Sequence, residues 1–150
     1  MEESRARERI DPLTMAAIAF IAANVLHTLD HLRQGLGGIT TEVLAGGGVL
    51  SALAIATLVL ALTRDRRAPL AAAVVGTWSA LGVAASHIAP HWSALSDSYL
   101  DIHVDALSWA VMLAEVAAAA VLGLVGFRTL RRSGDRARAQ TSGAKAMTST

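Results

Sequence analysis

The chain has 150 residues, a length that suits one domain; 53% of them are hydrophobic and only 17% are charged. This balance leaves too little polar surface for a water-soluble domain and predicts an integral membrane protein. The absence of cysteine excludes disulfides, thiolate metal sites, iron–sulfur clusters and cysteine nucleophiles. The net charge of +1 is too small to favour nucleic acid as a partner.

The N-terminal segment, residues 1–12, is polar and precedes an apolar stretch, as the start of a signal peptide would. No small-residue cleavage pattern follows, and the apolar stretch runs on to Asn24 and His27 instead. The pattern therefore predicts an uncleaved first membrane span. Pro12 suits the first turn of this helix, and Asp11 before it is a good N-cap.

Three further apolar stretches follow the first. The second has no charged residue in twenty positions, the length needed to cross about 30 Å of hydrocarbon at about 1.5 Å per residue. After the fourth, the chain becomes polar and rich in small residues, which predicts disorder. We therefore predict an all-α, four-transmembrane-helix bundle over residues 13–128, with spans at about 13–32, 43–62, 70–89 and 101–127 and a disordered tail over 129–150.

Arginine and lysine are distributed unevenly between the two predicted sides. Residues 1–12, the turn between the second and third spans and the residues after the fourth span, from Arg128 on, carry twelve of the thirteen, and Arg33 lies alone on the opposite side. The positive-inside rule then predicts that both termini are cytoplasmic and that the protein lies in the plasma (inner) membrane. Alanine- and arginine-rich usage is typical of a GC-rich bacterial genome. The lipid bilayer is the expected partner, with a homo-oligomer or a membrane protein partner left open.

Two features are explained by packing and anchoring in lipid. Small residues recur at four-residue steps in the second and third spans, which predicts seams where helix backbones approach closely. Aromatic residues near the outer interface are expected to anchor there. The small residues are Gly48, Ala52 and Ala56, then Ala72, Gly76, Ala80 and Ala84; the aromatic residues are Trp92, Tyr99 and Trp109.

All five histidines fall at the predicted outer ends of spans. His27 and His31 are four residues apart in "HTLDH", and His87 and His91 are four apart in "HIAPH". This spacing places two imidazoles on one face of a helix, where both can reach one metal ion. His91 shares the face of His87 only if the helix continues through Pro90, which tends to kink or end a helix.

Carboxylates lie on the same predicted side. Asp30 is beside the face of the first histidine pair, and Asp105 is on a polar stripe of the fourth span; either can ligate a metal or hold the second ring nitrogen of a histidine. Asp101 is also explained as a capping-box residue with Ser98, and His103 points away from the stripe unless the helix starts after it. We predict a metal site of His27, His31, His87, His91, Asp30 and Asp105, with His103 and Asp101 as further candidates.

Glu115 lies deep in the fourth span, with no charged residue for nine positions before it and twelve after. It aligns in depth with Asn24 and Ser51, which predicts a polar pocket floored by Glu115. An ionisable residue at this depth indicates function, such as a proton relay. The alternative is a protonated glutamate that hydrogen-bonds two helices.

Imidazole and carboxylate without thiolate suit zinc, iron or manganese. Haem b held between histidines of the first and third spans is the cofactor alternative. The leading hypothesis is thus a metal or haem site serving redox or hydrolytic chemistry. No nucleophile is assignable, so the sequence leaves open whether the protein is an enzyme. A small proton-coupled transporter without metal, or an accessory subunit of a larger membrane complex, are the alternatives.

Overall fold

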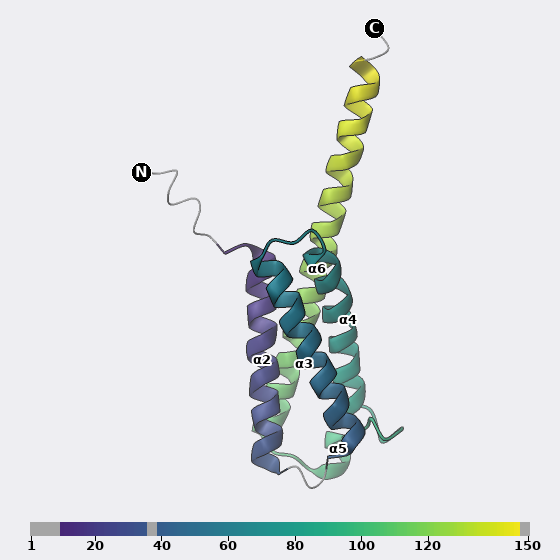
Figure 1. Cartoon of the computed structure of the whole chain (residues 1–150). Coiled ribbons are helices and arrows are strands. Elements are labelled where there is room, and N and C mark those ends of the chain that lie inside the picture. Colours follow the sequence, from purple (N-terminus) through teal and green to yellow (C-terminus); the bar gives the residue numbers. More distant parts are fainter. Residues whose placement is uncertain (1–9, 36–38, 148–150) are drawn as a thin grey trace, which may run out of the picture.

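The structure is a computed structural model that describes residues 10–35 and 39–147, and within these ranges all regular structure is helical. Four long helices run up and down as a bundle, and a short helix lies at one end of it (Figure 1). We call this end the α5 end. The helices are α2 (Pro12–Gln34), α3 (Thr41–Leu62), α4 (Ala68–His87), α5 (Tyr99–Ile102) and α6 (Ala106–Met147).

Four of these segments are long and apolar enough to cross a membrane: α2, α3, α4 and the part of α6 from Ala106 to Asp135. Large apolar side chains cover the outside of the bundle, among them Leu29, Leu53 and Trp78. An apolar exterior of this extent suits lipid contact rather than water. The structure therefore has four helices that could each span a membrane, which suits a membrane protein as the composition predicts.

Asp11 caps the N-terminus of α2, as the sequence predicts. The Oδ1 atom of Asp11 accepts hydrogen bonds from the backbone N–H groups of Leu13 at 3.0 Å and Thr14 at 3.1 Å, so Asp11 is the N-cap. Partial burial raises the pKa of Asp11, but the hydrogen bonds from Thr14 and Leu13 outweigh this effect and leave the pKa below its usual value.

The helices differ from the predicted third and fourth spans at the α5 end. α4 ends at His87, before Pro90, instead of reaching residue 89. The last span does not begin at residue 101: α5 ends at Ile102, and His103 takes a left-handed conformation with φ of 51° before α6 starts at Ala106.

The described part of the predicted tail, residues 129–147, belongs to α6. α6 continues as helix through residues 129–147 and projects beyond the rest of the bundle (Figure 1). This segment contains no proline, and alanine and arginine, which favour helix, are frequent in it. Residues 148–150 lie outside the described part of the chain.

Glycines let α4 and α6 pack closely along the middle of the bundle. A Cβ atom built on Gly76 would lie 2.4 Å from the backbone nitrogen of Gly123 and 2.6 Å from the carbonyl oxygen of Ala119. One built on Gly126 would lie 2.4 Å from the backbone nitrogen of Ala73. The small-residue row predicted on the third span therefore does form a seam, at least at Gly76.

The small-residue row predicted on the second span does not form such a seam. Nothing lies within 4 Å of a Cβ built on Gly48, and Ala52 and Ala56 are exposed. α3 instead buries another face, which carries Ala54, Thr57 and Ala61. The prediction was wrong because small residues permit close packing but do not specify which face of a helix meets its neighbours.

Candidate metal centre

Three of the five histidines meet at the α5 end. His27 and His31 come from adjacent turns of α2, and His87 is the last residue of α4. The distances between ring centroids are 4.6 Å for His27–His31, 4.9 Å for His27–His87 and 5.3 Å for His31–His87. One potential ligand atom of each residue lies within 4.8 Å of those of the other two, so the three can hold one metal ion. His27 and His87 are buried and His31 is partly buried.

Protein acceptors hold one ring nitrogen on two of these histidines. The Nδ1 atom of His27 is hydrogen-bonded to Oε2 of Glu115, and Nδ1 of His87 lies 3.0 Å from the backbone carbonyl oxygen of Asp97. Since a carbonyl only accepts, the Nδ1 atom of His87 carries the proton. This tautomer leaves Nε2 as the nitrogen that can bind a metal, the usual arrangement of metal-ligating histidines.

The residues of the predicted polar pocket form one hydrogen-bonded chain across three helices. Glu115 on α6 is 1% exposed. Its Oε1 atom accepts a hydrogen bond from Nδ2 of Asn24 on α2 at 2.8 Å. Ser51 on α3 in turn donates to Oδ1 of Asn24 at 2.9 Å. Both oxygens of Glu115 are thus bonded, one to Asn24 and the other to His27.

The sequence interpretation did not include Asp97 in the site. Its Oδ2 atom lies 3.8 Å from Nδ1 of His31 and 3.7 Å from Nδ1 of His87. Burial raises the pKa of Asp97, and the neighbouring histidines only partly offset this effect. The residue is in the irregular segment between α4 and α5, which folds back so that the Asp97 N–H donates to the carbonyl oxygen of Ser86 at 2.9 Å. The one sequence signal was that Asp97 falls on the same predicted side as the histidines.

Tyr99 was predicted to be an interface anchor, and this was wrong. The residue is 2% exposed, and its hydroxyl lies 3.2 Å from Nε2 of His27. Its ring packs against His87 at 4.7 Å and against Trp109 at 5.6 Å between centroids. Burial raises the pKa of the Tyr99 hydroxyl. Trp92, by contrast, is exposed as expected for an interface residue.

Two predicted carboxylate ligands are held by Arg33 instead. Its Nε atom lies 2.8 Å from Oδ1 of Asp30, and its Nη1 atom lies 3.0 Å from Oδ2 of Asp105. Gln34 donates to Asp30 at 2.6 Å and to Ser108 at 3.0 Å. The backbone N–H of Ser108 and the Arg33 guanidinium lower the pKa of Asp105. Neither carboxylate belongs to the histidine cluster, because Arg33 pairs with both, Gln34 donates to Asp30, and Ser108 donates to Asp105.

The remaining candidates lie apart from the cluster. His91 is exposed beyond the end of α4, because the helix stops before Pro90. His103 and Asp101 are exposed around α5, and the side chain of Ser98 makes no capping hydrogen bond to that helix. The predicted capping box therefore does not form.

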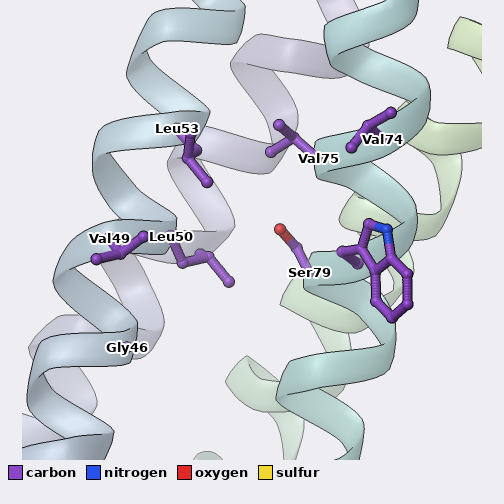
Figure 2. A pocket seen from close by; sticks show the side chains of 8 residues that line it. Gly46, Val49, Leu50, Leu53, Val74, Val75 and Ser79 are labelled. Carbon is purple, nitrogen blue, oxygen red and sulfur yellow. The ribbon is translucent and has the colours of Figure 1, made fainter.

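A separate pocket of about 320 Å³ lies between α3 and α4 (Figure 2). Its walls are apolar, and Ser79 supplies the one hydroxyl group among the lining residues. It contains no titratable side chain, in contrast to the histidine cluster. The lining residues are Gly46, Val49, Leu50, Leu53, Val74, Val75, Trp78 and Ser79.

Comparison with known proteins leaves the function to be argued from this geometry. No protein-family model, no curated protein and no solved structure matches the chain.

Proposed function

We propose that this is a four-span membrane protein that binds one divalent transition-metal ion through His27, His31 and His87, with zinc as the best match. The observation that carries the proposal is the convergence of the three histidines with Nδ1 of His27 and of His87 already held by protein acceptors. Three imidazoles without thiolate form a ligand set that zinc uses widely.

The charge balance of the site supports a cation. Glu115 and Asp97 are both more than nine-tenths buried. Within the described part of the chain, the ion pairs of these two carboxylates are with His27, His31 and His87. Ionised carboxylates beside three neutral imidazoles give the site a negative charge, which a divalent ion helps to neutralise. Such neutralisation matters most in a low-dielectric surrounding, where an uncompensated charge is costly.

The spacing of the rings favours a single ion over haem b. Zinc–nitrogen bonds of about 2.0–2.1 Å place neighbouring ligands of a tetrahedral site about 3.3 Å apart. The nitrogens lie within 4.8 Å of one another, so small rotations of the side chains close the shell. A porphyrin must instead lie between its two axial histidines. The rings of His27 and His87 are 4.9 Å apart between centroids, which leaves no room for a porphyrin between them.

The distribution of basic residues supports placing the site toward the outer face of the plasma membrane, with both termini inside. The ion then comes from the solution outside the cell. An ion of this kind with an open position acts as a Lewis acid in hydrolysis or, if iron, as a redox centre. The fourth ligand therefore decides whether catalysis is open to this protein.

The test is metal analysis of detergent-purified protein after chelator treatment and reloading with Zn²⁺. The wild type is expected to hold one zinc per chain, and a His27→Ala/His31→Ala double variant none. A His91→Ala/His103→Ala double variant is the matched control, since it removes two histidines that lie outside the cluster, and it should retain the zinc. Failure of the wild type to bind zinc, iron or manganese refutes the proposal, and a Soret band that disappears with His27 and His31 would replace it with haem.

A second candidate has one specific observation in its favour. The chain of hydrogen bonds from Ser51 through Asn24 and Glu115 to His27 links the bundle interior to the histidine cluster. A metal-free proton-coupled transporter would use such a chain. Proton-coupled flux in reconstituted vesicles that is lost with Glu115→Gln, from protein free of metal, supports this alternative.

A further inference from the structure

We infer that the phenolic oxygen of Tyr99 is the fourth ligand of the bound ion, which makes the site a closed, four-coordinate shell of three nitrogens and one oxygen. This inference rests on the proposed function, because the other three ligands are His27, His31 and His87. It goes beyond it by naming the donor that fills the remaining position.

The position of the hydroxyl carries the argument. The Nδ1 atom of His27 is bonded to Glu115, so Nε2 is the nitrogen that takes the metal, and the Tyr99 oxygen lies 3.2 Å from this atom. Ligands of a tetrahedral ion with bonds of about 2.0–2.1 Å are about 3.3 Å apart. The Tyr99 oxygen is therefore already at the ligand-to-ligand distance from the first nitrogen of the shell.

The other oxygens near the cluster are either bonded to other groups or lie farther from the histidine nitrogens. Both oxygens of Glu115 are bonded, to Asn24 and His27. The Oδ2 atom of Asp97 lies 3.7 Å from Nδ1 of His87, which the Asp97 carbonyl already holds, and 3.8 Å from Nδ1 of His31, so both distances are longer than that from the Tyr99 oxygen to His27. Asp97 therefore contributes charge and holds His87, while Tyr99 faces a metal-binding nitrogen.

Packing holds the phenol in this place. Tyr99 is the first residue of α5, and its ring lies between His87 and an edge-on Trp109. With 2% of the residue exposed, the ring has little freedom to turn away. On binding, the O–H bond breaks, the proton leaves to solvent, and the oxygen lone pair forms the bond to the ion.

A closed shell has a functional consequence. Structural zinc sites are closed, whereas catalytic ones keep a position for water or substrate. With Tyr99 bound, the ion has no such position and joins α2, α4 and α5 at one point. The bound ion then has a storage, sensing or structural role rather than a hydrolytic one.

The experiment uses Cu²⁺ as a spectroscopic probe and Zn²⁺ for affinity, on full-length protein in detergent. Phenolate bound to Cu²⁺ gives a visible charge-transfer band, and Tyr99 is the only tyrosine in the chain. We expect the band in the wild type and in Trp109→Phe, and its loss in Tyr99→Phe. The Zn²⁺ affinity of Tyr99→Phe should fall by about 100-fold or more, the upper end of what loss of an outer-shell partner costs.

The outcomes separate this inference from the proposed function. If the wild type binds both metals without a phenolate band, and Tyr99→Phe keeps its Zn²⁺ affinity, then Tyr99 is not a ligand and the histidine site stands with an open position. If the wild type binds neither metal, both ideas fail. Should Tyr99→Phe not fold, the wild-type spectrum decides alone, because no other tyrosine can give the band.

Discussion

Gly76→Ala tests whether close packing of α4 on α6 positions the histidine end of α4. The added Cβ atom would meet the backbone of Gly123 at 2.4 Å and the carbonyl of Ala119 at 2.6 Å. Non-bonded carbon contacts are favourable at about 3.5–4.0 Å, so the two helices must separate by about 1 Å. The contact atoms are backbone atoms, which cannot move aside as a flexible side chain can.

Gly82→Ala is the matched control on the same helix. Gly82 is exposed, and nothing lies within 4 Å of its would-be Cβ. Both substitutions gain the same helix propensity, about 1 kcal/mol relative to glycine. The difference between the two variants therefore isolates the clash. We expect this difference to be about 1–3 kcal/mol, the usual cost of overpacking.

The measurement is thermal unfolding by circular dichroism in detergent with a chelator present, with the Zn²⁺ affinity of the same samples. Gly76→Ala should unfold at lower temperature than wild type and Gly82→Ala at the same or higher temperature. Gly76→Ala should also bind Zn²⁺ more weakly, because His87 moves with α4. Equal stability of the two variants would refute the reasoning, since it would mean that α4 and α6 can separate at Gly76 without loss of unfolding free energy.

Three further outcomes follow from single contacts. The pKa of Asp11 is lowered in the fold, so its stabilising effect is complete above its unfolded pKa of about 3.9 and is lost as pH falls through the folded value. Asp11→Ala should cost about 1 kcal/mol at neutral pH and nothing in strong acid, whereas Asp11→Asn, which caps without titrating, should show no such pH dependence in thermal unfolding. Ser51→Ala removes the donor to Oδ1 of Asn24 and should cost about 1 kcal/mol of unfolding free energy in the same assay. Arg33→Met leaves the buried Asp30 without its cation and should lower the unfolding temperature, and an unchanged value would show that Gln34 alone satisfies that carboxylate.

The regular parts of the site could be predicted because helix geometry is periodic. A rotation of about 100° per residue puts Asn24, His27 and His31 on one face of α2 whatever the rest of the chain does. Hydrocarbon thickness limits the length of each span, which brings Ser51 and Glu115 to similar depth. Similar depth predicted that these residues gather in one polar region, and the structure joins them by hydrogen bonds.

The irregular parts of the site could not be predicted in this way. Asp97 and Tyr99 follow Pro90 in a segment without periodicity, and their positions depend on how that segment folds back onto the end of α4. Arg33 was counted only as a topology signal, yet its long side chain reaches Asp30 on its own helix and Asp105 across the bundle. Sequence spacing does not encode whether such a flexible side chain turns to water or to a carboxylate.

Metal binding should stabilise the bundle where its own packing is weakest. α2 and α4 pack mainly on α6 and α3 and touch each other little, while the ligands His27 and His31 belong to α2 and His87 to α4. Zn²⁺ at 100-fold above its dissociation constant should add about 2.7 kcal/mol, if only the folded state binds it. His87→Ala should abolish the corresponding rise in unfolding temperature.

Combining Gly76→Ala with Zn²⁺ binding tests whether α4 transmits a displacement at Gly76 to His87. Gly76 and His87 are eleven residues apart, about 16 Å along the helix. Sites separated by more than about 10 Å with no shared partner usually contribute additively. If α4 moves as a rigid helix, the clash at Gly76 instead displaces His87. The stabilisation of Gly76→Ala by Zn²⁺ then falls below the wild-type value at the same Zn²⁺ concentration. Strict additivity would show that the helix bends between the seam and the site, and that the metal centre assembles independently of the α4–α6 packing.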